Sequence, residues 1–149
     1  MAYISNIIPF IGATKSVNGV FALSPVTLTA TAADNRASLQ VTSSEQLVLY
    51  IRYITGSGET NNVLNMTVEF SPDGTLFYQE ATEEASTTTV TEYQATRQFT
   101  GAVAATTYSF RVLIPIADID RIRISFAETG VVTNFGTVSV LAVLSDQHA

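Results

Sequence analysis

Apolar and polar residues alternate along most of this chain, and residues 63–80 show the pattern most clearly. In the first half of this stretch every second position is apolar: Leu64, Met66, Val68 and Phe70. This is the period of a β-strand with one buried side and one solvent-facing side. The segment 71–74, with the sequence SPDG, predicts a tight turn because Pro72 fixes its own φ and Gly74 eases the exit. Residues 75–80 complete a predicted β-hairpin.

The same alternation recurs along the chain in segments separated by short runs of turn-forming residues. These segments are residues 26–31, 38–42, 46–55, 107–114, 121–126 and 136–144. Together with the hairpin they give about eight strands, with turn sequences roughly every 8–14 residues. No segment has a convincing helical period. The pattern predicts an all-β protein, an antiparallel sandwich or barrel. Strand order stays open, since an immunoglobulin-like sandwich fits almost as well.

Residues 46–55 differ from the other predicted strands because both of their sides are largely apolar. One side holds Leu47, Leu49, Ile51 and Tyr53, and the other holds Val48, Tyr50, Arg52 and Ile54. Such a strand is typical of a central position that is covered on both sides. Residues 81–86, by contrast, predict a polar loop, and residues 87–99 fit either an exposed edge strand or a long loop.

Residues 1–24 are apolar but show neither a strand period nor a helical period. Pro9, Gly12 and Gly19 interrupt them. We interpret them as an extended arm that lies on its own domain, a neighbouring subunit or another protein, because apolar side chains are costly to leave in water. The alternative is that they are simply the first strand of the domain and a loop. The predicted domains are thus the arm (1–24), the sandwich (25–145) and a polar tail (146–149).

Composition narrows the class of protein. The chain has 149 residues, of which 46% are hydrophobic, and this is enough for one domain with a core. The net charge is −6 and Lys15 is the only cation before residue 36, so no nucleic-acid partner is predicted. No run reaches the roughly 18 apolar residues of a membrane span, so no membrane partner is predicted either.

The sequence predicts no catalytic site. His148 is the only histidine and cysteine is absent, which leaves no Ser–His–Asp or Cys–His arrangement and no zinc site. Asp118 and Asp120 could bind calcium with Asp73 or Glu128, although turn formation is favoured because no calcium-loop series is present. We therefore predict no enzyme activity, no cofactor and no metal.

Two groups of residues are candidates for binding a partner protein. The first is the apolar part of the arm: Ile4, Ile7, Ile8, Phe10 and Ile11. The second is the pair Arg121 and Arg123, which project from one side of a predicted strand. These arginines could dock an acidic neighbour, although pairing with Glu69 or Glu92 across strands is the favoured alternative.

The apolar arm, the number of strands and two sequence segments together resemble a known class of protein. The segments are VEFSPDGTLFYQE and DRIRISFAETG. They look like the jelly-roll virion proteins of tailed bacteriophages, most closely the head decoration (cement) proteins. The resemblance implies a jelly-roll β-sandwich and a homotrimer on the capsid surface. It also implies that the protein stabilises the head by bridging capsomers, with the major capsid protein as its partner.

Two other functions fit the same pattern. One is a tail, neck or fibre component of the virion. The other is a carbohydrate- or receptor-binding sandwich that presents Tyr78, Tyr93 or Tyr108 on a concave face. Discoidin-type sugar-binding sandwiches also have an SPDG turn, but there a Trp usually follows, whereas this chain has Leu76-Phe77-Tyr78.

Overall fold

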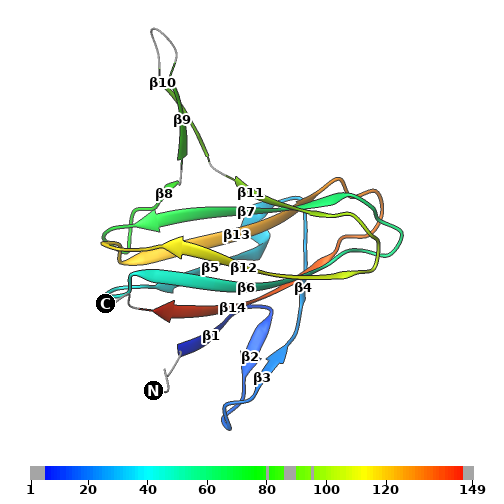
Figure 1. Cartoon of the computed structure of the whole chain (residues 1–149), viewed down its shortest axis with the longest axis horizontal. Coiled ribbons are helices and arrows are strands. Elements are labelled where there is room, and N and C mark those ends of the chain that lie inside the picture. Colours follow the sequence, from blue (N-terminus) through cyan, green and yellow to red (C-terminus); the bar gives the residue numbers. More distant parts are fainter. Residues whose placement is uncertain (1–5, 80, 86–89, 95, 146–149) are drawn as a thin grey trace.

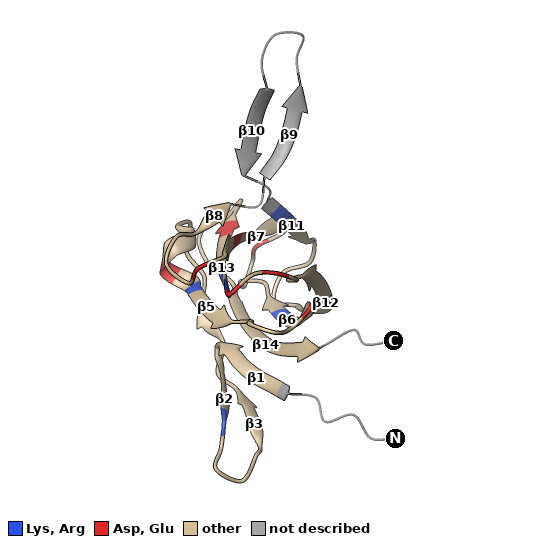
Figure 2. Ribbon diagram, turned by 90° about the vertical axis from the view of Figure 1, so that its left-hand side faces the viewer, with Lys and Arg blue, Asp and Glu red and all other residues tan. Residues whose placement is uncertain are grey.

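The computed structural model (Figure 1) describes residues 6–79, 81–85, 90–94 and 96–145. For residue 6 and the described part of residues 81–96 it describes the backbone alone. Two antiparallel β-sheets pack face to face (Figures 1 and 2). The long strands of both sheets lie roughly along the horizontal axis of Figure 1. No helix in these residues is long and apolar enough to cross a membrane.

Each sheet has four main strands and one short addition. The first sheet runs in the order β1 (Asn6–Ile11), β14 (Thr137–Ser145), β6 (Gln46–Ile54) and β12 (Thr107–Pro115), and β4 (Val26–Thr27) also pairs with β14. The second runs in the order β11 (Thr96–Gly101), β7 (Asn62–Ser71), β13 (Arg121–Thr129) and β5 (Arg36–Gln40), and β8 (Tyr78–Gln79) also pairs with β7. Two hairpins and a short 3-10 helix complete the fold. The first hairpin pairs β2 (Ala13–Lys15) with β3 (Phe21–Leu23), and the second pairs β9 (Ala81–Ala85) with β10 (Val90–Gln94). The 3-10 helix is η1 (Ala32–Asn35).

The main strands pair in a nested order. The first, β1, pairs with the last, β14; β5 pairs with β13, β6 with β12, and β7 with β11. This is the arrangement of a long antiparallel ribbon rolled up into two sheets, which is a jelly roll. The predicted all-β jelly-roll sandwich of about eight strands is therefore confirmed, and the immunoglobulin-like strand order is excluded.

The core lies between the two sheets and is built from the predicted alternating positions. The first sheet contributes Leu47, Leu49, Ile51, Tyr53, Ile114, Val138, Val140 and Ala142, and the second contributes Leu64, Met66, Val68, Ile122, Ile124 and Phe126. All of these side chains are at most 1% exposed. Full burial of a large apolar side chain stabilises the fold by about 1.5–3 kcal/mol. The alternation seen in the sequence therefore determines which face of each sheet points inward.

The predicted hairpin at residues 63–80 forms, with a wider turn and a shorter second strand than expected. Strand β8 has two residues, and its Tyr78 lies opposite Phe70 of β7. The turn is held by Asp73, whose Oδ1 accepts hydrogen bonds from the N–H groups of Thr75 at 2.8 Å and Leu76 at 2.9 Å. These backbone donors lower the pKa of the Asp73 carboxyl group.

Two predictions for other segments are wrong. Residues 81–85 form strand β9, paired with β10, instead of a polar loop. This hairpin points away from both sheets (Figure 1). The strand predicted at 26–31 ends at Thr27, because the buried Leu28 turns inward and its N–H donates to the carbonyl of Gly136 at 2.9 Å.

Residues 6–11 are the first strand of the sandwich, which was the alternative to their interpretation as an extended arm. Strand β1 pairs with β14 from Asn6, opposite Leu144, to Ile11, opposite Val140, with a bulge between Pro9 and Ile11. Gly12, at φ +58°, then turns the chain into the β2–β3 hairpin. This hairpin projects from the opposite edge of the molecule to β9–β10 (Figure 1).

Two buried carboxylates hold the loop between β13 and β14 at one end of the sandwich. Glu59 accepts hydrogen bonds from the N–H groups of Val132 (2.9 Å), Thr133 (2.5 Å) and Asn134 (2.7 Å). These three donors lower the pKa of the Glu59 carboxyl group to about 2. Glu128 accepts from the Tyr53 hydroxyl and from the Gly136 N–H. Burial, and then the hydrogen bond to Glu128, raise the pKa of Tyr53.

The lowered pKa of Glu59 predicts a loss of stability in acid. Its value in the folded chain, about 2, lies below the unfolded value of about 4.3. The stabilisation is therefore complete above about pH 5 and is lost as the pH falls towards about 2. Urea unfolding of Glu59→Gln across this range should show a flatter dependence of the free energy of unfolding on pH than wild type. Asp118→Asn, at an exposed carboxylate, is the control, and an unchanged slope in Glu59→Gln would contradict this role.

Candidate functional site

The outward side of the first sheet carries a continuous apolar surface, here called the outer face. Its apolar residues are Ile7, Pro9, Val48, Tyr50, Leu113, Leu141 and Val143. They form two rows across the strands, one from Ile7 through Val143 and Val48 to Leu113, the other from Pro9 through Leu141 to Tyr50. Ile7 is 37% exposed, Tyr50 46% and Leu113 49%. Contiguous exposed apolar surface of this kind marks an interaction site.

The charge on the outer face is positive, although the whole chain is acidic. Arg52 on β6 and Arg111 on β12 are exposed and are the only charged residues in the four main strands of this sheet. No aspartate or glutamate occurs in these strands, while the chain as a whole has 13 acidic residues. The outer face therefore combines apolar area with guanidinium donors.

Tyr50 stands between two shallow hollows on the outer face. One, of about 440 Å³, is lined by Tyr50, Ile51, Arg52, Ser109, Phe110 and Arg111. The other, of about 330 Å³, is lined by Ile7, Tyr50, Leu141 and Val143. Apolar walls with a few hydrogen-bond donors suit binding, and neither lining contains a carboxylate, histidine or cysteine for acid–base or nucleophilic chemistry.

The outer face corrects one sequence prediction about residues 46–55. Strand β6 is central in its sheet, as predicted, but the residues that the structure describes cover only its inner side. The apolar pattern of the other side, with Val48 and Tyr50, was visible in the sequence. A sequence pattern cannot distinguish a covering layer in the same chain from one in another molecule.

The β2–β3 hairpin presents a second apolar surface, the hairpin tip (residues 16–20). Its turn is closed by the Ser16 N–H, which donates to the Val20 carbonyl at 2.8 Å, and Gly19 adopts φ +79°. Val17 is 103% exposed and Val20 is 63% exposed. Below the tip, the Lys15 ammonium group lies 5.4 Å from the centre of the Phe21 ring. The tip is therefore a small apolar knob that projects beyond the sandwich.

The apolar residues that were predicted to bind a partner lie in different parts of the structure. Ile4 lies outside the described residues. Ile7 belongs to the outer face. Ile11 is a core residue, and Ile8 and Phe10 pack against the core. These last three side chains pack inside their own domain: Ile8 and Phe10 share the inner side by alternation, and the bulge brings Ile11 to the same side. Their assignment to a partner is therefore corrected.

Arg123 forms the predicted pair across strands. It lies directly opposite Glu69, with Nη2 2.7 Å from Oε2 and Nε 3.1 Å from Oε1. Its guanidinium group also lies 4.1 Å from the centre of the Phe77 ring. Arg121, half-buried two residues earlier in β13, lies opposite Ser71 of β7 and Gln40 of β5. Glu92, the other predicted pairing partner, is in β10, of which only the backbone is described.

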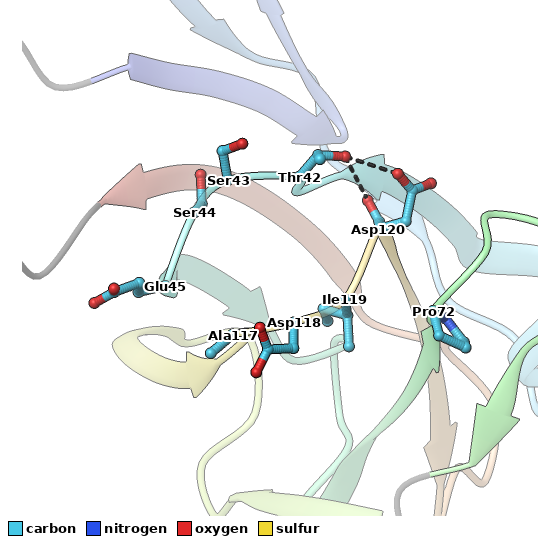
Figure 3. A pocket seen from close by; sticks show the side chains of 9 residues that line it. All are labelled: Thr42, Ser43, Ser44, Glu45, Pro72, Ala117, Asp118, Ile119 and Asp120. Carbon is cyan, nitrogen blue, oxygen red and sulfur yellow. Dashed lines mark hydrogen bonds between the residues drawn. The ribbon is translucent and has the colours of Figure 1, made fainter.

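A polar pocket of about 430 Å³ lies at the end of the sandwich, between the β5–β6 and β12–β13 connections (Figure 3). The Thr42 hydroxyl donates to Oδ1 of Asp120 at 2.7 Å. The carboxylates of Asp118 and Asp120 point in different directions (Figure 3). Glu128, at the far end of β13, bonds to Tyr53 and Gly136 instead. Across the described part of the chain, no three His, Cys, Asp or Glu residues form a metal-binding group.

The tyrosines considered for carbohydrate binding do not form one surface. Tyr78 is 58% exposed in β8. Tyr108 is half-buried beside the core; its hydroxyl accepts from the Val103 N–H at 2.9 Å and its ring centre lies 6.4 Å from that of Tyr53. The side chain of Tyr93 lies outside the described residues. The exposed tyrosine of the outer face, Tyr50, was not among the candidates.

Comparison with known proteins assigns no family to this chain. No family model matches the chain, and no curated protein matches it. One similar solved structure is a carbohydrate-binding module specific for non-crystalline cellulose, with 14% identity and a TM-score of 0.41. The match covers 90% of this chain and 77% of that chain. Similarity at this level carries no argument about function.

The position of β1 predicts that substitutions at two of its isoleucines change the stability of the fold by different amounts. Ile11→Ala should lower the free energy of unfolding by about 2–4 kcal/mol, because it empties a buried site. Ile7→Ala in the same strand should change it by less than about 1 kcal/mol, because this side chain is partly exposed. Urea unfolding of both variants measures the difference. Equal effects would show that β1 is not anchored in the core as described.

Proposed function

We propose that this protein is a non-catalytic structural component of a virion that decorates and stabilises a tailed-phage capsid. The observation that carries the proposal is the exposed hairpin tip, which projects from the sandwich on β2 and β3 within the segment 1–24. Burying its two valines against another protein would gain about 1.5–3 kcal/mol each. The tip would insert into a groove on the major capsid protein.

The shape of the molecule supports a bridging role. The β2–β3 hairpin projects from one edge of the sandwich (Figures 1 and 2), and the β9–β10 hairpin projects from the opposite edge (Figure 1). A protein that bridges capsomers must contact more than one neighbour, and such projections extend the reach of a small domain. The jelly-roll strand order is the fold that the resemblance to decoration proteins implies. The predicted trimer at local threefold positions remains part of this proposal, and it concerns the protein bound to the capsid.

Binding to capsids tests this function. Wild-type protein should co-sediment with purified capsids of the phage that encodes it. The double variant Val17→Ser, Val20→Ser should bind about tenfold more weakly or worse, since two apolar contacts are lost. Val132→Ser, at a position 88% exposed in the β13–β14 loop, is the matched control and should bind like wild type.

Two results would contradict the proposal. One is a wild-type protein that does not bind the capsid. The other is a double variant that binds as tightly as Val132→Ser. Finding the protein in purified tails and not in heads would favour the alternative of a tail, neck or fibre component.

A further inference from the structure

We propose that the outer face is covered by a second copy of this chain in a two-fold symmetric dimer. The inference concerns a different surface from the hairpin tip and does not depend on the proposed capsid function. It starts from the strands themselves. Strands β6 and β14 carry apolar residues on both sides, a pattern typical of sheets with a layer on each face. Their inner sides face the second sheet, and their outer sides have no layer within the described chain.

The size of the outer face fits a stable interface. Three strands of nine residues and β1 of six, at about 3.3 Å per residue and about 4.8 Å between strands, make a face of roughly 520 Å². Two such faces in contact bury on the order of 1,000 Å², which reaches the roughly 1,000 Å² expected of a specific interface. Two sheets can stack in this way with their strands within about 30° of each other, as in the sandwich itself.

The distribution of charge specifies how the two copies are oriented. Arg52 is near one end of β6, and Glu45 immediately precedes the other end. Both residues are exposed. Seven residues of extended chain, about 23 Å, separate them within one copy, so they cannot pair there. A two-fold axis perpendicular to the strands reverses the ends and brings Arg52 of each copy next to Glu45 of the other.

The same axis also aligns the apolar rows. If it crosses β6 between Val48 and Tyr50, Tyr50 of each copy meets the Val48 row of the other copy. The row from Pro9 to Tyr50 then packs against the row from Ile7 to Leu113. Arg111 lies on the edge strand β12, where a long side chain can keep its guanidinium group in water. The outer face is thus self-complementary, as a two-fold contact requires.

Mass measurement in solution tests the dimer. Sedimentation equilibrium of the full chain should give a monomer–dimer equilibrium. Tyr50→Glu should shift it to monomer by at least about a hundredfold in dissociation constant, because it places two carboxylates in the apolar centre. Leu76→Glu, at a position 59% exposed in the β7–β8 turn, is the matched control and should dimerise like wild type. Circular dichroism should show that both variants are folded.

A charge exchange tests the orientation. Arg52→Glu and Glu45→Arg should each weaken the dimer by about tenfold, because the symmetric contact contains the ion pair twice. The double variant should return to within about threefold of wild type, since it restores both pairs with reversed polarity. Such recovery cannot arise within one copy, where the two side chains are at opposite ends of β6.

Several outcomes would overturn the inference. They are a wild-type chain that stays monomeric at all concentrations, a trimer, a dimer that Tyr50→Glu leaves intact, and a double variant that shows no recovery. A carbohydrate bound by the monomer on a glycan array, and lost in Tyr50→Glu, would assign the outer face to a sugar instead. Because none of these measurements involves a capsid, their failure is distinguishable from failure of the proposed function.

Discussion

A β-sheet that is apolar on both sides needs a cover on each side, and the described part of the chain supplies only one. This constraint explains most of what the structure shows. The second sheet covers the inner side of the first and encloses a core of fully buried aliphatic and aromatic side chains. The outward side keeps Tyr50, Leu113 and Ile7 in contact with water. The domain therefore has a closed core but keeps an exposed apolar surface, and this surface is available for association.

The long strands could be predicted from the sequence because their inner positions alternate without interruption. In β13, for example, Ile122, Ile124 and Phe126 all point into the core. The first strand was predicted only as an alternative to an arm because its bulge breaks the period: Ile8 and Ile11 are three positions apart and both point inward. Strand β9 was not predicted because its sequence is polar, and its evidence in the structure is backbone pairing with β10.

The candidate site was predictable only in part. The pair between Arg123 and Glu69 follows from alternation plus a register that places them opposite each other. The outer face follows from the two-sided pattern of residues 46–55, but its exposure does not. Glu59 and Glu128 resemble ordinary surface acids in the sequence. In the structure they are buried, and they bind backbone N–H groups of a loop that would otherwise lack partners.

The nested pairing of strands has a consequence for how the chain is made. The pair β7–β11 joins neighbouring parts of the chain, whereas β1 pairs with β14, and Asn6 lies opposite Leu144. During synthesis β1 emerges first but has no partner until the last strand has left the ribosome. Its isoleucines stay exposed for the whole of translation, a state in which newly made chains aggregate. Among the strands of the two sheets, β1 is therefore the one that waits longest for its partner.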